Sequence, residues 1–297
     1  MQIGMTLPTM LPHGRDESLA WCHAIDEGPW SSLAVPERVT FPSHSWIVEL
    51  AAAAAVTARV RLWTTIIVLP AHPEVQVAKD LASIDRLSGG RLTVGVGVGG
   101  REHDYRALGA PFTRRWERMD DQVATMQRIW AANPPFEGAD PVGPPPHQPG
   151  GPPLIAGVMG PKALARAARW AHGVDDASTI TGVDGDAAAA TFARINDAWR
   201  DAGRSEVPHV SASLWYALGD GAADRLQRYA FDYLRIFGDD MARALADSAT
   251  TSTPAALRTA VDTLSGAGCD ELFLVPTTAD PVELERTRDA LGPLLQG

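Results

Sequence analysis

The feature that most constrains the fold is a set of eight short, mostly apolar runs separated by helical segments. Strands buried on both faces form continuous apolar runs, whereas strands with one wet face alternate. Eight such runs alternating with helices favour a closed α/β barrel of the (β/α)8 TIM type over an open sheet, so we expect one barrel domain over residues 1–297. The predicted strands are Ile3–Thr6, Ser32–Val35, Val60–Val68, Leu92–Val98, Pro153–Ala156, Gly173–Val174, Val210–Leu218 and Glu271–Val275.

The segments between these runs carry apolar side chains at helical spacing. One stripe, with residues three or four apart, consists of Trp116, Met119, Val123, Met126 and Trp130. Two further stripes are formed by Phe192, Ile195 and Trp199 and by Leu226, Ala230, Tyr233 and Phe237.

Substrate contacts in a barrel of this kind are expected on its variable loops. Residues 133–153 are dense in proline and glycine, which excludes a helix or a central strand there. A loop of that length is either a mobile lid over a site or a solvated spacer. The other predicted substrate loops are 7–15, 178–190 and 238–253, of which 238–253 is either a lid or a simple connector.

The charge balance and the cysteine usage exclude several classes of protein. Acidic residues outnumber basic ones 36 to 26, a balance that repels phosphate backbones, so we expect no nucleic-acid partner. The two cysteines have no nearby partner, and neither H-E-x-x-H nor C-x-x-C occurs, so we expect reduced thiols and no metal site. The start of the chain does not resemble a signal peptide, and no apolar run approaches the roughly 18 residues of a membrane span. We therefore expect a cytoplasmic protein without a membrane partner.

Residues 95–100, GVGVGG, satisfy the G-x-G-x-x-G pattern of dinucleotide-binding folds. The context argues against that interpretation, because at least three strands precede the pattern and no helix follows it directly. A glycine-lined strand end explains it better, since bare backbone at Gly97, Gly99 and Gly100 lets a flat ring or a phosphate approach. A tight turn without a ligand is the alternative.

The fifth strand ends in a similar way, in the sequence IAGVMGPK over residues 155–162. Gly157 and Gly160 leave the backbone bare, and Pro161 suits the first turn of a helix whose free N–H groups can bind phosphate. Lys162 would add a positive charge there, unless it is an ordinary surface lysine.

Polar residues at the ends of other strands are candidate site residues, and each has a functional and a purely structural interpretation. Thr64 and Thr65 either hydrogen-bond a ligand or bond neighbouring backbone. Glu37 and Arg38 follow the second strand, where barrel enzymes keep catalytic groups, but they also suit a plain ion pair.

Residues 79–100, KDLASIDRLSGGRLTVGVGVGG, closely resemble the signature of the luciferase-like monooxygenases. That signature joins an alanine-rich helix, a Leu-Ser-Gly-Gly-Arg turn and a glycine-rich strand end. Residues 60–73, 106–130 and 153–173 are similar to the family segments around it, so the resemblance covers most of residues 60–175.

The resemblance implies a flavin-type barrel, usually a homodimer, that binds FMN or the deazaflavin coenzyme F420 over the carboxyl ends of its strands. By position, Thr64 and Thr65 would flank the ring, and the Thr65–Ile66 peptide bond would be cis. Gly97, Gly99 and Gly100 would contact the ring or its ribityl chain. The phosphate would bind at Gly157, Val158, Met159, Gly160 and Lys162.

The chain also departs from the family pattern. Many F420-dependent members carry an Asp-His pair where this chain has Glu37-Arg38, and the sugar-phosphate dehydrogenases carry an acid where it has Gly100. The resemblance therefore supports neither that activity nor a particular proton donor. Glu37 and Arg38 are the candidate catalytic residues, with Arg38 stabilising negative charge on a reduced ring or a substrate oxygen.

The GVGVGGRE-type segment resembles that of F420-dependent members, and the acidic tail of F420 would suit a mouth lined by Arg38, Arg101 or Arg106. We therefore expect an oxidoreductase that uses F420 to transfer hydride to or from a small organic substrate. One alternative is an FMN-dependent monooxygenase, and either enzyme would be served by a separate flavin or F420 reductase. The residues also allow a lyase or isomerase that uses Glu37, His72 or Glu102, or a flavin-binding barrel without catalysis.

Overall fold

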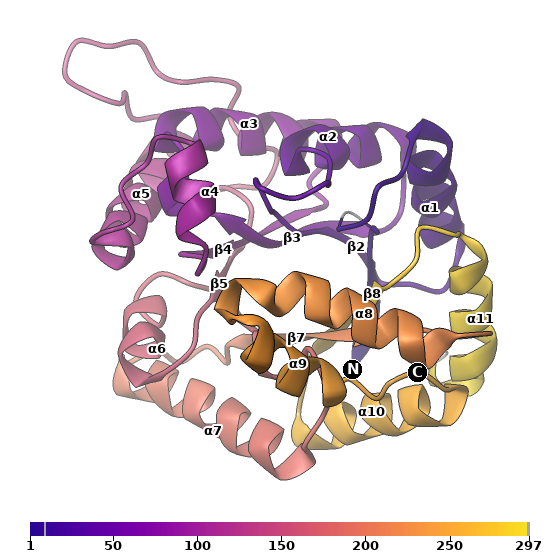
Figure 1. The fold of residues 1–297 in the computed structure, drawn as a ribbon. Helices are drawn as coiled ribbons and strands as arrows, with labels where there is room; N and C mark the ends of the chain where they lie inside the picture. Colours follow the sequence, from indigo (N-terminus) through magenta and orange to yellow (C-terminus); the bar gives the residue numbers. More distant parts are fainter. Residues whose placement is uncertain (9, 296–297) are drawn as a thin grey trace.

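A computed structural model of the chain describes residues 1–8 and 10–295, so Thr9, in the predicted loop 7–15, and residues 296–297 lie outside the described part. Eight parallel strands close into a barrel in the order β1 to β8, with β8 paired to β1, which confirms the predicted fold class (Figure 1). The strands are β1 (Gln2–Thr6), β2 (Ser32–Val35), β3 (Arg61–Val68), β4 (Leu92–Gly97), β5 (Leu154–Gly157), β6 (Gly173–Asp176), β7 (His209–Tyr216) and β8 (Glu271–Pro276).

Helices surround the barrel and cover its outer face (Figure 1). Their apolar stripes pack against the strands in the main hydrophobic core, to which α1, α3, α5 and α7 contribute. The α-helices are α1 (Arg15–Glu27), α2 (Trp46–Val56), α3 (Glu74–Leu87), α4 (Glu102–Ala107), α5 (Arg115–Trp130), α6 (Pro161–Ala167), α7 (Gly185–Asp201), α8 (Ala222–Leu234), α9 (Asp239–Asp247), α10 (Pro254–Ala267) and α11 (Val282–Leu291). Short 3-10 turns are η1 (Leu69–Ala71), η2 (Ala177–Thr179), η3 (Arg235–Phe237) and η4 (Gly292–Leu295).

The described part of the chain contains no helix with both the length and the apolar character of a membrane span. Cys22 and Cys269 are free and buried, as expected for reduced thiols. Burial raises the pKa of each thiol to about 12, so neither is a reactive thiolate at neutral pH.

The loop over residues 133–153 lies at the amino ends of the strands, away from the end where a barrel carries its chemistry. The Asp85 carboxylate accepts hydrogen bonds from the backbone N–H groups of His147 (2.7 Å) and Gln148 (2.8 Å). The Gln148 side chain donates to the carbonyl of Leu92, the first residue of β4. The interpretation of this loop as a lid is therefore wrong, and in Figure 1 it projects from the rear of the molecule.

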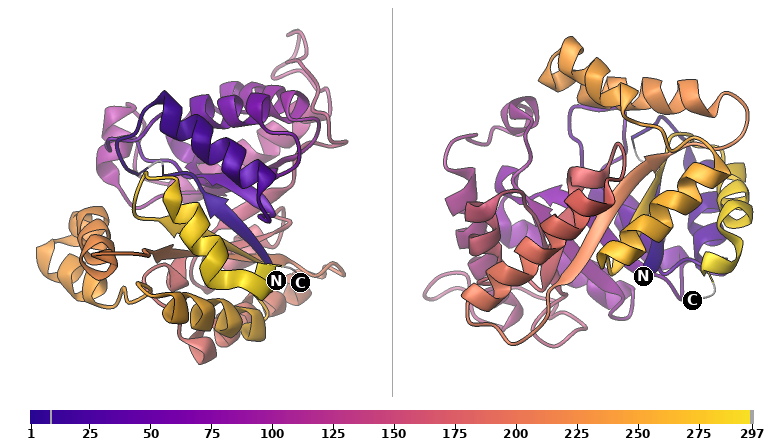
Figure 2. Two further views of the ribbon diagram at one scale, coloured as in Figure 1. Left: turned by 90° about the vertical axis from the view of Figure 1, so that its right-hand side faces the viewer. Right: turned by 90° about the horizontal axis from the view of Figure 1, so that it is seen from below.

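After β7 the chain leaves the barrel and forms the α8–η3–α9 excursion, which stands out from the barrel wall (Figure 2). Leu226 and Ala230 are buried, as the predicted stripe requires. Phe237 is 57% exposed, so that stripe does not continue into the core at its end. Two aromatic residues of this stripe, Tyr233 and Phe237, instead line the cleft described below.

The sixth strand extends to Asp176, two residues beyond the predicted Gly173–Val174. The sequence obscures this because Asp175 and Asp176 are charged yet buried. Inside the barrel, Ser211 donates a hydrogen bond to the Asp175 carboxylate (3.0 Å), which gives the buried group a partner.

Burial of Asp175 has a consequence for stability, because it raises the pKa of the carboxyl from 3.8 to about 6. The protonated form stabilises the fold below about pH 4, and that contribution is lost as the pH rises through about 6. Between pH 4 and pH 7.5 the wild type should lose about 2.4 kcal/mol of unfolding free energy through this group, a loss that Asp175→Asn should not show. Urea titrations at both pH values check this. Asp262→Asn, at an exposed position on α10, should show the same loss as the wild type, and an equal loss in both variants would contradict the assignment.

Candidate active site

A cleft of about 200 Å³ opens at the carboxyl ends of β2, β3 and β4. It brings together five of the predicted site residues: Glu37, Arg38, Thr65, Gly99 and Gly100. The rest of its lining consists of Pro36, Ile66, Val68, Arg101, Asp104, Tyr233 and Phe237. The cleft thus joins the strand ends to the α8–η3–α9 excursion.

Glu37 lies buried at one side of the cleft, and its carboxylate is held at both oxygens. Its Oε1 lies 2.6 Å from His72 Nε2, and its Oε2 accepts a hydrogen bond from the backbone N–H of Val68 (2.6 Å). His72 in turn is positioned by Gln122, which donates to its carbonyl, and by the nearby Trp46 ring. The sequence offered Glu37 and His72 as separate candidates, and the structure joins them into one pair that can hold or pass a proton.

Arg38 points along the other side of the cleft and does not pair with Glu37. Its guanidinium carbon lies 3.7 Å from the centroid of the Tyr233 ring, a cation–π contact, and 5.8 Å from that of Phe41. The Arg38 Nη1 atom is buried and has no hydrogen-bond acceptor among the described residues. An unpaired buried N–H of a cation is costly, which makes Arg38 a ready partner for a negative group. The interpretation of Glu37 and Arg38 as a plain ion pair is therefore wrong.

The two threonines of β3 have different surroundings. Thr64 is fully buried, and its hydroxyl donates to the Gly95 carbonyl (2.8 Å), so its side chain does not line the cleft. Of the two interpretations of Thr64, the bond to neighbouring backbone is the one found. Thr65 lines the cleft, and the Thr65–Ile66 peptide bond is cis, as predicted.

The Ile66 side chain fills the top of the barrel and explains two of the glycines. A Cβ on Gly97 would lie 2.6 Å from Ile66 Cδ1, and a Cβ on Gly157 would lie 3.0 Å from Ile66 Cγ2. These two glycines make room for a side chain of the protein itself. Gly100 differs, because a Cβ there would meet nothing within 4 Å. Gly100 therefore provides bare backbone beside open space.

The predicted phosphate residues run from Gly157, the last residue of β5, to Lys162 in the first turn of α6, and they lie outside the cleft lining. Val158 is buried, whereas Met159 is 68% exposed and Gly160 and Lys162 are also exposed. A Cβ on Gly160 would meet nothing within 4 Å, so this segment leaves its backbone accessible there. Its role in phosphate binding stays a prediction.

Asp104 and Arg101 close the cleft on the side of α4. Asp104 is buried and accepts a hydrogen bond from the Thr40 N–H (2.9 Å), and its carboxylate lies 3.7 Å from Arg101 Nε. Burial would raise the pKa of Asp104, but the bonds from Thr40 and the charge of Arg101 outweigh it and lower that pKa. Burial, and next the charge of Arg38, lower the pKa of Arg101.

Sequence reasoning missed the contributions of Tyr233 and Phe237, because their helical spacing resembles that of core residues. It also missed that Asp104 anchors the loop after β2 through Thr40. No local signal reveals either contact, since each joins segments far apart in the chain.

The comparisons with known proteins agree with this architecture. The model of the family described as luciferase-like monooxygenase matches residues 2–279. The chain belongs to that family. The luciferase-like family comprises flavin- and F420-dependent oxidoreductases and monooxygenases, which supports an enzyme.

Individual relatives are more distant. An uncharacterized protein of Mycobacterium tuberculosis is 29% identical over 185 residues, which cover 52% of this chain and 64% of that protein. An F420-dependent secondary alcohol dehydrogenase, solved with an F420–acetone adduct, has a TM-score of 0.81 at 18% identity over 100% of this chain and 99% of its own. The monooxygenase RslO1 of Streptomyces bottropensis has a TM-score of 0.78 at 23% identity over 98% and 97%. At these identities the structures show a shared fold.

Proposed function

We propose that this luciferase-like protein is an oxidoreductase that binds F420 at the carboxyl ends of its strands and transfers hydride to or from a small organic substrate. The observation that carries the proposal is the cleft itself. Gly100 with its bare backbone, Arg38 with its unpaired buried N–H and Glu37, which is paired with His72 behind it, line one space. That space offers room for a flat ring, a donor for its negative charge and a proton carrier.

The residues present fit a ring of the flavin type. Thr65, Gly99 and Gly100 would contact it, and Gly160 and Lys162 are the proposed phosphate contacts. When bound, the coenzyme supplies a carbon that accepts or donates hydride. Arg38 would stabilise the negative charge that develops beside it, and Glu37, oriented by His72 and the Val68 N–H, would move the proton.

A second candidate function is FMN-dependent monooxygenation, with reduced flavin supplied by a separate reductase. The structural similarity to the monooxygenase RslO1 supports this second candidate. The similarity to the F420-dependent secondary alcohol dehydrogenase supports the first. The two candidates share the cleft and differ in the coenzyme.

Titration of the purified protein with oxidised FMN and with oxidised F420 separates the candidates. We expect saturable binding of F420, followed by its absorbance band at about 420 nm, and weaker binding of FMN. Anaerobic reoxidation of the reduced coenzyme by a panel of ketones, aldehydes and alkenes then identifies substrates. Tight FMN binding with oxygen consumption would favour the monooxygenase, and binding of neither coenzyme would overturn both candidates.

Filling the cleft provides a direct test of the binding site. Gly100→Phe places a ring in the open space beside Gly100, so we expect coenzyme affinity to fall by about 100-fold or more, as expected when a bound ring is sterically displaced. Thermal melting should change little, because a Cβ at this position meets no protein atom within 4 Å. Gly266→Phe controls for a new exposed ring, because Gly266 is an exposed residue of α10 without a positive φ, and a Cβ there would also meet nothing within 4 Å. Unchanged coenzyme affinity in Gly100→Phe would place the coenzyme elsewhere.

A further inference from the structure

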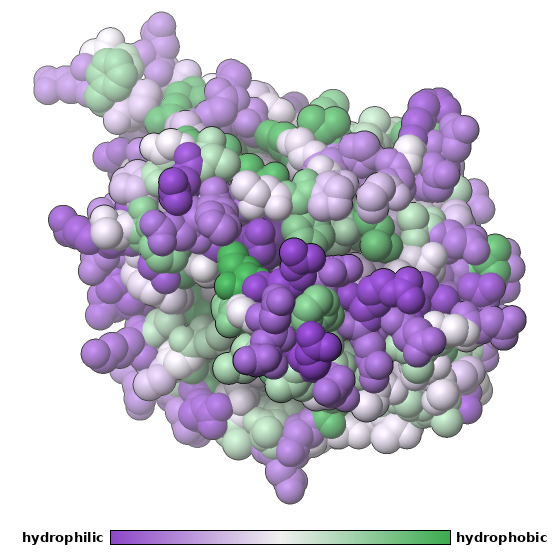
Figure 3. Space-filling model, in the orientation of Figure 1, coloured by the Kyte–Doolittle hydropathy of each residue, from purple (hydrophilic) through white to green (hydrophobic). Residues whose placement is uncertain are grey.

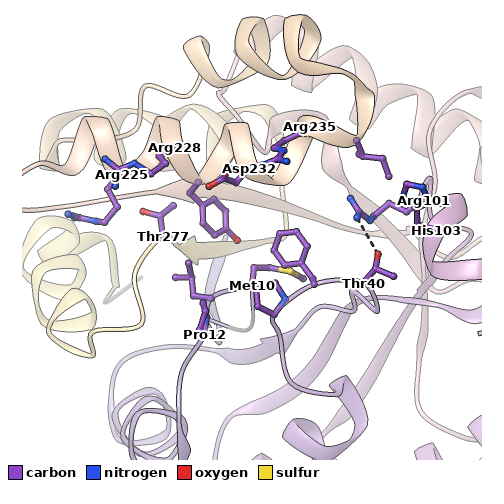
Figure 4. Close-up of a pocket in the computed structure, with 15 residues that line it drawn as sticks. Met10, Pro12, Thr40, Arg101, His103, Arg225, Arg228, Asp232, Arg235 and Thr277 are labelled. Carbon is purple, nitrogen blue, oxygen red and sulfur yellow. Dashed lines mark hydrogen bonds and ion pairs between the residues drawn. The ribbon is translucent and has the colours of Figure 1, made fainter. Parts of the chain in front are cut away.

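A second, larger cavity of about 840 Å³ opens beside the cleft, between α8 and the loops that follow β1, β2 and β4. Figure 4 shows Arg225, Arg228 and Arg235 along α8 and just past its end on one side, and Arg101 on another. Arg101 lines the cleft as well, so the cavity and the cleft share a wall.

The charge of this cavity is opposite to that of the chain. Its lining holds four arginines and a single carboxylate, that of Asp232, although the protein has an excess of ten negative charges. Asp232 lies 3.7 Å from Arg235, and both are exposed. Among the described residues, none pairs with the Arg228 side chain. In Figure 3 strongly hydrophilic surface runs along α8.

Two of these arginines hold buried Nε–H groups without a hydrogen bond in the described part of the chain, and one of them, Arg101, is also ion-paired with Asp104, whose carboxylate lies 3.7 Å from its Nε. The Nε atoms of Arg101 and Arg225 are buried and make no hydrogen bond within the described residues. The other nitrogens of Arg225 donate to the carbonyls of Leu218 and Asp220, which fix the guanidinium in place. A preorganised guanidinium in partly dry surroundings favours a carboxylate, because charge-assisted hydrogen bonds offset the cost of burying the cation.

Apart from Thr40, His103 and Thr277, the remaining lining of the cavity is mostly apolar. Met10, Phe41 and Tyr229 line it, and the Tyr229 ring belongs to an aromatic cluster with Tyr233 and Trp215. Such a surface suits the body of an aromatic or other apolar molecule, while the arginines suit its charged end.

We infer that this cavity binds the substrate, and that the substrate is an organic carboxylate with an aromatic or similarly apolar body. The inference rests on the proposed function, which places the coenzyme in the adjoining cleft. An acidic coenzyme tail has the same carboxylate chemistry, so the test must separate the two sources. The shared wall at Arg101 favours a substrate, because a molecule held there has its body beside the reacting cleft.

The test compares 2-naphthoate with its neutral isostere 2-naphthamide, by calorimetric titration of the full chain. We expect naphthoate to bind about tenfold more tightly or better, since one charge-assisted contact is worth that much. Arg228→Gln and Arg101→Gln should each lower naphthoate affinity by about tenfold and leave naphthamide affinity nearly unchanged. Arg288→Gln, at an exposed arginine of α11, removes the same charge far from the cavity and should change neither.

Binding of both probes to the wild type can also be measured at increasing salt concentration. This measurement needs no variant, so it does not depend on whether the variants fold. Molar salt should weaken naphthoate binding and leave naphthamide binding nearly unchanged, because screening acts only on the charged probe. Equal affinity for the two probes, at low salt and in the wild type, would overturn the inference.

Repeating the titration with each coenzyme at saturation distinguishes the sources. Selective naphthoate binding that persists in the F420-loaded protein supports a substrate site. Loss of that binding with F420 but not with FMN would show that the acidic tail occupies the arginines, which overturns the assignment to substrate. Coenzyme binding without a preference for naphthoate over naphthamide overturns the inference about the substrate and leaves the proposed function standing. Selective naphthoate binding in a protein that takes up neither coenzyme overturns the proposed function and, with it, the role as substrate.

Discussion

Glu37→Gln should lower the turnover of the coenzyme-loaded enzyme by about 10²–10⁴-fold, the usual contribution of a positioned acid or base. Glutamine keeps the shape of the side chain and can still accept the hydrogen bond from the Val68 N–H. It cannot hold or release a proton at the atom that lies 2.6 Å from His72. The measurement is the rate of hydride transfer in a single turnover with the best substrate of the reoxidation panel.

Glu102→Gln is the matched control for this prediction. Glu102 is an exposed acid on α4 near the mouth, and it lines neither the cleft nor the cavity. That variant should keep the wild-type rate, and both variants should bind the coenzyme as the wild type does. A fast Glu37→Gln enzyme, or a slow Glu102→Gln enzyme, would move the proton chemistry away from the Glu37–His72 pair.

Gly95→Ala should cost about 3 kcal/mol of folding free energy, at the upper end of what overpacking a core usually costs. A Cβ on Gly95 would lie 2.1 Å from the Thr64 carbonyl oxygen and 3.0 Å from Ile66 Cγ2. Because the nearer atom is backbone, β3 itself would have to move. Denaturant unfolding monitored by circular dichroism measures the loss.

Gly100→Ala provides the comparison, only a few residues along the same segment. Its Cβ would meet nothing within 4 Å, so its stability should stay within about 0.5 kcal/mol of the wild type. Equal stabilities for the two alanine variants would mean that the barrel interior tolerates a side chain at Gly95, and that the packing of Ile66 is looser than the structure shows.

The strand pattern could be predicted well because each strand is a local, nearly continuous apolar run. The predicted strands lie within two residues of the observed bounds at either end, and the shortest of them, Gly173–Val174, covers only the first half of β6. Burial of charged residues caused that shortfall, because Asp175 finds its partner on β7, which no local pattern reveals. The same limit applies to loop 133–153, whose composition fits a lid but whose partner Asp85 lies at the opposite end of the barrel.

The candidate site could be predicted only in part. The glycines at the end of β4 and just after it were predicted to leave the backbone bare for a ligand. Gly97, however, makes room for the Ile66 side chain, whereas Gly100 lies beside open space. Two glycines a few residues apart therefore occur for different physical reasons, and only the atoms that surround each one show which reason applies. Likewise Glu37 and Arg38, adjacent in the chain, turn to different partners, His72 and Tyr233.

The sequence by itself determined the barrel, since burial on both faces requires apolar strands and the helices between them require a 3.6-residue period. It also placed polar and bare residues at the strand ends, where a barrel brings its loops together. Only the tertiary structure decided which of these residues share one cleft, because contacts across the mouth join distant segments. The pairing of Glu37 with His72, the aromatic support of Arg38 and the arginine-lined cavity under α8 all depend on closure of the sheet and on the excursion after β7.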